Sequence, residues 1–267
     1  MQPLLAAYTD AEAGKEKRVF DRAHGEEQRP LAMPGGHGQN FHVLKDVYRS
    51  LYREGYRFAY LGNIDNLGFT VDPVSLAICG LRGADAAFEF SFRTPIDVKG
   101  GILVENSHGR LDCRDLGPAV PFEEMLEAER SGRRILFNCA IGLFSLASLD
   151  KNLDRIIDTL PVRFSEQDKK AGRYAQAEQI TWEVMGLLSH PLVLGVAKFE
   201  RFLAVKVLVE GLMTSGLRLA DPGFPAKLRP LADSLHHGLV KKLSTEYGLK
   251  EINGRWEPKT LEELDIT

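Results

Sequence analysis

A glycine-rich loop with a histidine occupies residues 34–40, where the sequence reads Pro-Gly-Gly-His-Gly-Gln-Asn. Three glycines in four positions allow a ligand to approach the backbone, and peptide N–H groups ahead of a helix can bind an anion. Gly36 and His37 are therefore candidate ligand-binding residues. The alternative is a flexible turn with a solvent-exposed histidine, and the loop alone does not decide between the two.

A second polar segment, residues 63–66, reads Asn-Ile-Asp-Asn and follows a short apolar run. A carboxylate such as Asp65 can hold Mg²⁺ together with substrate phosphates, and the side chains of Asn63 and Asn66 can meet sugar hydroxyls. The alternative is that Asp65 and Asn66 form an Asx-type turn without a ligand.

The elements that must position these residues follow from the spacing of apolar side chains. Helical spacing over 40–54 predicts an amphipathic helix, and the apolar run over 57–62 predicts a buried strand. Further helices are expected over 73–81, 121–131, 149–160, 177–188 and 226–246, and strands over 86–93, 100–105, 135–144 and 192–208. This alternation predicts an α/β fold with a mixed, mainly parallel sheet. In such sheets ligands bind at the carboxyl ends of strands, where residues 63–66 fall.

Three parts are expected along the chain: a loosely attached lead-in over 1–30, a main domain over 31–210, and a helical extension over 211–267. The net charge of -3 and the lack of a Lys or Arg run argue against nucleic acid as a partner. Apolar stretches fall short of the roughly 20 residues that a membrane span needs, and no signal peptide is visible, so a cytoplasmic location is expected. Cys79, Cys113 and Cys139 lie far apart, as buried thiols would, rather than as a zinc site or disulfide framework.

The order of these motifs resembles the UTP–glucose-1-phosphate uridylyltransferase family, in which a Gly-His-Gly loop, a helix and a strand ending in Asn-x-Asp-Asn-Leu-Gly follow one another. Three later segments are similar to family motifs: residues 97–101 to its Lys-Gly-Gly strand, residues 137–138 to its Phe-Asn-Thr-Asn-Asn segment, and residues 201–206 to its Arg-Phe-Leu-Pro-Val-Lys segment. The resemblance implies a nucleotide-diphospho-sugar transferase fold of the GT-A, Rossmann-like type.

The resemblance also implies a role for each matching residue. Gly36 would approach the uracil ring, and His37 would lie near the sugar phosphate. Asp65 would bind Mg²⁺, with Asn66 beside it near the sugar or ribose. The implied reaction joins UTP and glucose 1-phosphate into UDP-glucose with release of pyrophosphate.

Three further residues carry implied roles that compete with structural ones. Lys99 and Lys206 would steady phosphates and Asn138 would face glucose. Taken alone, the two lysines read as ordinary surface residues, although Lys206 has unusually apolar neighbours. Asn138 reads equally well as a hydrogen-bonded core residue.

The sequence departs from the family pattern at its start, because it contains no Leu-x-Gly-Gly-x-Gly-Thr-x-x-Gly loop of the kind that wraps the triphosphate in the family. Residues 139–141, Cys-Ala-Ile, also stand where the family has Thr-Asn-Asn, and Ala204 stands for a proline. We therefore expect an N-terminally truncated domain that associates with itself or with a companion chain. A non-catalytic nucleotide-sugar-binding subunit or a truncated remnant that needs a partner remains the alternative to an active uridylyltransferase.

Overall fold

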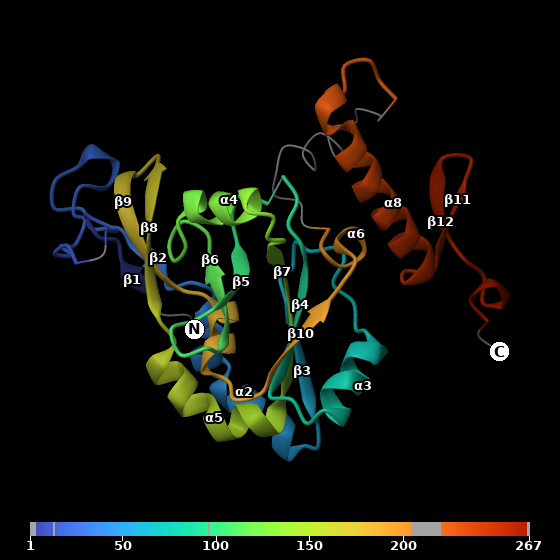
Figure 1. Ribbon diagram of the computed structural model, residues 1–267, viewed down its shortest axis with the longest axis horizontal. Helices are drawn as coiled ribbons and strands as arrows, with labels where there is room; N and C mark the ends of the chain where they lie inside the picture. Colours follow the sequence, from blue (N-terminus) through green and yellow to red (C-terminus); the bar gives the residue numbers. More distant parts are fainter. Residues whose placement is uncertain (1–3, 13, 96, 204–219, 266–267) are drawn as a thin grey trace.

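The computed structural model describes residues 4–12, 14–95, 97–203 and 220–265. Its centre is a six-stranded sheet with the order β10-β4-β7-β5-β6, in which β3 also pairs with β7. The strands of this sheet are β3 (Phe58–Gly62), β4 (Ala86–Phe92), β5 (Gly101–Glu105), β6 (Leu111–Asp115), β7 (Leu136–Ser145) and β10 (Pro191–Gly195). Figure 1 shows the sheet at the middle of the molecule with helices on both sides.

The sheet is mixed, as the sequence predicted. The strands β10 and β4 run parallel, whereas the pairs β4–β7, β3–β7, β5–β7 and β5–β6 are antiparallel. The expectation of mainly parallel pairing therefore holds only for β10 and β4 among the described strands. β7 pairs with three neighbours, and it is buried along nearly its whole length, which explains its continuous run of apolar residues.

Helices predicted from apolar spacing cover the sheet. The helices before the C-terminal part are α1 (Asn40–Val43), α2 (Lys45–Arg53), α3 (Pro73–Leu81), α4 (Phe122–Arg130) and α5 (Leu146–Thr159). The Asp72 carboxylate caps α3 by accepting hydrogen bonds from the backbone N–H groups of Val74 and Ser75, as its place before Pro73 predicted. The apolar faces of α2 and α5 meet over the main core, where the Phe88 and Phe144 rings pack edge to face with centroids 5.5 Å apart.

Two regions at the N-terminal side differ from the sequence prediction. The lead-in is attached rather than loose, because β1 (Leu4–Ala6) pairs with β2 (Ala32–Pro34) and the N–H of Tyr8 donates to the carbonyl of Ala175 at 2.8 Å. The helix predicted over 177–188 is right only for its later residues: β8 (Val162–Lys169) and β9 (Gly172–Gln179) form a hairpin, and the 3₁₀ helix η3 (Thr181–Leu187) follows. Alanine and glutamine in β9 favour a helix locally, and pairing with β8 overrides that preference.

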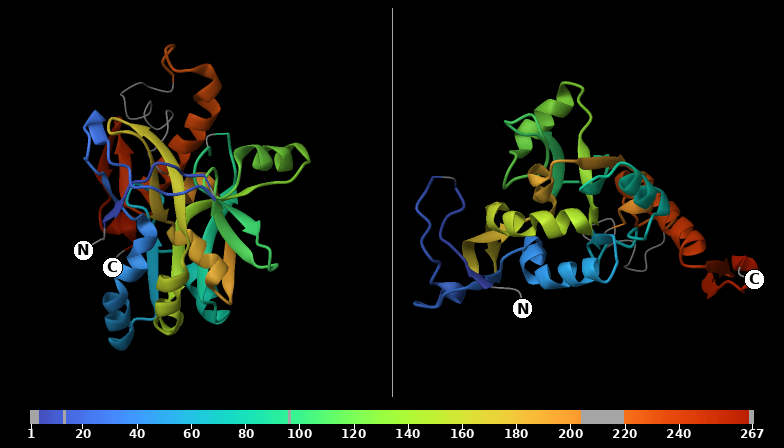
Figure 2. Two further views of the ribbon diagram at one scale, coloured as in Figure 1. Left: turned by 90° about the vertical axis from the view of Figure 1, so that its left-hand side faces the viewer. Right: turned by 90° about the horizontal axis from the view of Figure 1, so that it is seen from below.

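The C-terminal part begins with the parallel strand β10. The strand predicted over 192–208 ends early, at Gly195, and the short helix α6 (Lys198–Arg201) follows. The helix predicted over 226–246 is confirmed as η4 (Ala226–Leu228) and α8 (Arg229–Thr245), and the hairpin of β11 (Leu249–Ile252) and β12 (Arg255–Pro258) comes next. Figure 2, in its right-hand view, shows α8 and the β11–β12 hairpin at the opposite end of the molecule from the N-terminal strands and the β8–β9 hairpin. Lys206 lies outside the described residues.

One simpler expectation is also met by the described structure. The three cysteines are free and buried, as their apolar neighbours predicted. Among the described residues, no helix is both long enough and apolar enough to cross a membrane.

Candidate functional site

The Gly-His-Gly loop packs directly on the end of β9. A Cβ atom at Gly36 would lie 2.5 Å from the carbonyl oxygen of Gln179, and one at Gly38 would lie 2.8 Å from its carbonyl carbon. Gly36 also has a φ of 84°, in the left-handed region that favours glycine. Both glycines are therefore required by close backbone contact within the protein, whatever ligand the loop binds.

The His37 ring is held by Thr181, 144 residues further along the chain. The backbone N–H of Thr181 donates to Nδ1 of His37 at 3.0 Å, and the Thr181 hydroxyl lies 2.9 Å from the carbonyl oxygen of His37. The Asn40 amide donates to the same carbonyl at 2.8 Å and to the Thr181 hydroxyl at 2.9 Å. Ring and main chain of His37 are thus fixed by residues from two other elements.

A small cavity of about 130 Å³ opens beside this histidine. Its lining comes from the loop, from the end of β3 and from the start of η3: His37, Asn40, Leu61, Gly62, Asn63, Thr181 and Trp182. The fold therefore brings the two polar segments singled out in the sequence together at the carboxyl end of a strand. That is the place at which open α/β sheets bind ligands.

Asn66 has a structural position in the turn after β3. It is 4% exposed, its Oδ1 accepts hydrogen bonds from the N–H groups of Leu203 at 2.8 Å and Gly68 at 3.0 Å, and its Nδ2 donates to the carbonyl of Arg201 at 2.9 Å. These bonds tie the turn to the segment after α6. Asp65, beside it, is half-buried in the same turn. The ligand roles of both residues stay predictions.

A second, larger cavity of about 710 Å³ lies between the β8–β9 hairpin and the segments next to β5 and β6. It is lined by Lys99 and Gly100 before β5, by Asp115 at the end of β6, and by Glu178 of β9. Lys99 is exposed, as a phosphate-binding lysine and an ordinary surface lysine would both be. The buried ion pair between Lys198 and Asp97, 2.7 Å long, fixes the turn from which Lys99 projects.

Asn138 lies in the middle of β7 and is not among the residues that line this larger cavity. It is 3% exposed, and its Oδ1 accepts a hydrogen bond of 2.8 Å from the N–H of Ala140, whose φ is 53°. Among the described residues its Nδ2 has no hydrogen-bond partner. Gly101 on the neighbouring strand packs against Cys113, because a Cβ there would lie 2.5 Å from Sγ of Cys113 and 3.6 Å from Cβ of Asn138. A buried amide without an acceptor is costly, so this atom is suited to meet a polar ligand group.

Asp115 is a site residue that the sequence pattern did not reveal. Burial, and secondarily the charge of Glu178, raises its pKa to about 6. Its pKa exceeds the ordinary value of 3.8, so Asp115 favours folding only while protonated, and that contribution is lost as pH rises from about 4 to about 6. The signal in the sequence was one acidic residue at the end of a strand, and many exposed positions share that pattern.

Replacing Asp115 with asparagine should therefore stabilise the protein at neutral pH. A shift of about two pKa units, reduced for partial exposure, corresponds to a gain in the free energy of unfolding on the order of 2 kcal/mol at pH 7.5. Urea unfolding at pH 4 and 7.5 would measure it, and the gain should shrink at pH 4. The matched control is Asp168→Asn on β8, an exposed position. An equal gain at both pH values would contradict the shifted pKa.

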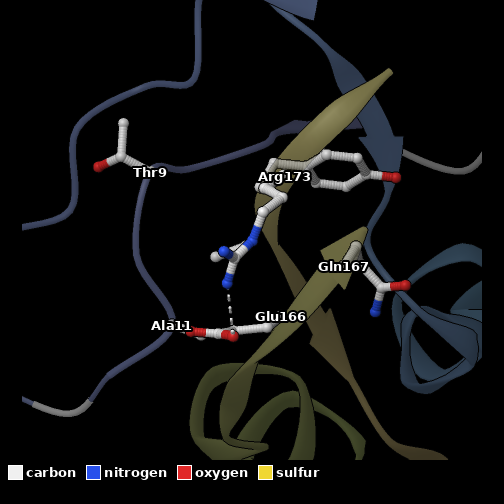
Figure 3. Close-up of a pocket in the computed structure, with 7 residues that line it drawn as sticks. Thr9, Ala11, Glu166, Gln167 and Arg173 are labelled. Atoms are coloured by element: carbon white, nitrogen blue, oxygen red, sulfur yellow. Dashed lines mark ion pairs between the residues drawn. The ribbon is translucent and has the colours of Figure 1, made fainter. Parts of the chain in front are cut away.

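A third cavity, of about 290 Å³, lies between the N-terminal segment and the β8–β9 hairpin (Figure 3). Glu166 and Arg173 face each other across it as an exposed ion pair 3.9 Å long. None of the residues predicted from the sequence lines this cavity. It shares Ala11, Glu166 and Gln167 with the larger cavity.

Comparison with known proteins identifies the family to which this chain is similar. Residues 14–219 match the family model of UTP–glucose-1-phosphate uridylyltransferase. The chain belongs to this family. Among curated relatives, the UTP–glucose-1-phosphate uridylyltransferase of Encephalitozoon cuniculi is 30% identical over 123 residues, which are 45% of this chain and 25% of the relative. That of Pyrus pyrifolia is 26% identical over 196 residues, which are 72% of this chain and 41% of the relative.

Solved structures of the family share the fold. The structure of a UDP-glucose phosphorylase from Trypanosoma brucei superposes with a TM-score of 0.65 at 23% identity, over 79% of this chain and 47% of that protein. A Leishmania major UDP-glucose pyrophosphorylase in complex with UDP-glucose gives a TM-score of 0.62 at 22% identity. The chain thus spans about half the length of these family members, or less.

Proposed function

We propose that this chain forms the nucleotide-sugar side of a uridylyltransferase site, at which UTP and glucose 1-phosphate give UDP-glucose and pyrophosphate. The observation that carries the proposal is the cavity at the carboxyl end of β3, where the Gly-His-Gly loop and Asn63 meet. Family membership supports the reaction, and the buried amide of Asn138, whose Nδ2 has no partner among the described residues, supports a role in meeting a polar ligand group.

The proposed chemistry needs no protein nucleophile. A phosphate oxygen of glucose 1-phosphate attacks the α-phosphorus of UTP, a new P–O bond forms, and the bond to the bridging oxygen of pyrophosphate breaks. Protein groups then contribute mainly by positioning the reactants and neutralising charge. Backbone contacts at Gly36, the ring of His37 and the ammonium groups of Lys99 and Lys206 are the groups proposed for this task.

Mg²⁺ is the proposed cofactor, with Asp65 as its protein ligand. Among the described residues no group of three or more His, Cys, Asp or Glu side chains could hold a metal ion. Mg²⁺ often uses one or two carboxylates together with substrate phosphates, so a single aspartate at the carboxyl end of β3 fits this ion. When bound, the ion would neutralise phosphate charge.

The alternative is a subunit that binds UDP-glucose without turnover. It is favoured by one observation: the 267 residues contain no glycine-rich triphosphate loop of the family type. For turnover we propose that residues outside this sequence, in a companion chain or a longer form, hold the triphosphate. Association with a further polypeptide or a second copy is part of the proposal.

A coupled pyrophosphate-release assay with UTP, glucose 1-phosphate and Mg²⁺ tests the reaction, and calorimetry with UDP-glucose tests binding. We expect Asp65→Asn to lower release about 100-fold, as for the loss of a group that stabilises developing charge. Asp46→Asn, on the exposed side of α2, is the matched control and should leave the rate unchanged. Binding of UDP-glucose without release of pyrophosphate would select the non-catalytic alternative. The absence of both binding and release would refute the proposed function.

A further inference from the structure

The hydrogen bond between Thr181 and His37 determines which ring nitrogen carries the proton. A backbone N–H can only donate, so Nδ1 of His37, 3.0 Å from the Thr181 nitrogen, must accept. A neutral imidazole with an accepting Nδ1 carries its proton on Nε2. A proton on Nδ1 would instead face the amide proton of Thr181.

We infer that Thr181 is a positioning residue that keeps neutral His37 in the Nε2–H tautomer, so that the ring offers a hydrogen-bond donor to the oxygen atoms of a bound phosphate. This inference rests on the proposed function for the identity of the ligand. It does not depend on that function for the tautomer itself, which the protein sets without a ligand.

The Thr181 hydroxyl extends the arrangement into a chain of hydrogen bonds. Tyr48 donates to Oδ1 of Asn40 at 2.9 Å, the Asn40 amide donates to the Thr181 hydroxyl, and that hydroxyl donates to the carbonyl of His37. Burial raises the pKa of Tyr48 to about 12, so its hydroxyl stays a donor across the neutral range. The Thr181 hydroxyl also lies 2.8 Å from Nδ1 of His37, to which it can donate in place of the carbonyl, and in either case Nδ1 accepts from the Thr181 N–H.

Thr181 itself has little freedom to move. It opens η3, and the buried carboxylate of Glu183 in the same turn accepts two hydrogen bonds of 3.0 Å from Nε of Arg163 on β8. Arg114 of β6 lies 3.6 Å from that carboxylate as well. The anchor for the His37 ring is thus part of a packed junction between three elements.

An N–H donor on Nε2 of His37 suits a ligand that contains phosphate groups. Phosphate oxygens are acceptors, and a lone pair on Nε2 would repel them, whereas an N–H donates to them. His37 lines the small cavity with Asn63, whose amide adds a further donor, whereas the Asn40 amide, which also lines it, donates to the His37 carbonyl and the Thr181 hydroxyl. The cavity wall therefore presents donors from two side chains toward an anionic, oxygen-rich ligand.

Two variants of Thr181 distinguish the contribution of its backbone N–H to the His37 tautomer from that of its hydroxyl. Thr181→Pro removes both, and the backbone tolerates it, because position 181 opens a helix and Ile180 before it is extended, with a ψ of 121°. Thr181→Val keeps the N–H and removes only the hydroxyl, so it is the matched control. Circular dichroism and thermal melting establish that each variant folds.

The first readout is ¹⁵N NMR of the histidine ring nitrogens in the full chain, with His37 assigned by His37→Gln. We expect Nδ1 of neutral His37 to resonate as an unprotonated nitrogen and Nε2 as a protonated one, in the wild type and in Thr181→Val. Thr181→Pro should show a mixture of tautomers. A protonated Nδ1 in the wild-type protein would overturn the inference even if Thr181→Pro failed to fold.

The second readout is calorimetric binding of UDP-glucose. Thr181→Pro should bind about tenfold or more weakly, the cost of losing one hydrogen bond to a charged group, whereas Thr181→Val should stay within about threefold of the wild type. Equal binding by Thr181→Pro and the wild type would overturn the phosphate-donor role. If the wild type binds no UDP-glucose, the proposed function fails while the NMR result still decides the tautomer.

Discussion

Replacing Asn66 with alanine should lower the free energy of unfolding by about 3 to 4 kcal/mol, because buried backbone groups would lose their partners. The Asn66 side chain is the only described acceptor for the N–H of Leu203, and it also bonds to Gly68 and to the carbonyl of Arg201. At 4% exposure, water does not replace these bonds. Urea unfolding followed by circular dichroism would measure the loss.

The matched control is Asn63→Ala in the same turn. Asn63 is half-buried and lines the small cavity, and we expect its replacement to cost less than about 1 kcal/mol of stability. Its effect should instead appear in the binding of UDP-glucose. Equal losses of stability in the two variants would show that Asn66 is not the structural tie that its hydrogen bonds indicate.

The elements around β3 could be predicted from the sequence because their signals are local. The apolar run before Asn63, the capping Asp72 with Pro73 after it, and the apolar spacing of α2 each depend on neighbouring residues alone. The β8–β9 hairpin could not be predicted in this way. Its second strand contains good helix formers, and only pairing with β8 and contact with Tyr8 of the lead-in make it a strand.

The residues of the candidate site also differ in whether the sequence signals them locally. Spacing and resemblance singled out His37 and Asn63, and the structure places both on one cavity. Thr181 was missed because its contact with His37 spans 144 residues and depends on a backbone N–H, which no residue type reveals. Asn66 was selected as a ligand from its polar character, although its hydrogen bonds with backbone groups show that the same character serves the fold.

Breaking the buried ion pair between Arg201 and Glu89 should have the largest effect on stability. Nε and Nη2 of Arg201 donate to the two carboxylate oxygens of Glu89 at 2.7 and 2.5 Å, and Glu89 is 2% exposed in the middle of β4. Thr70 accepts further bonds from the same guanidinium. Either single change, Glu89→Gln or Arg201→Met, leaves an uncompensated buried charge and should cost about 3 to 5 kcal/mol.

The double variant Glu89→Gln/Arg201→Met distinguishes this pair from two independent contacts. Removing both charges together should cost about 2 kcal/mol less than the sum of the single changes, because neither partner is left charged and buried. The exposed pair of Glu200 and Lys241 is the control, since Glu200→Gln should cost less than about 1 kcal/mol. Additive losses in the double variant would show that Arg201 and Glu89 stabilise the protein separately. A strong coupling would mean that this pair holds α6 against β4, and that α6 in turn, through the bonds of Asn66 to Arg201 and Leu203, holds the turn after β3 that carries Asp65.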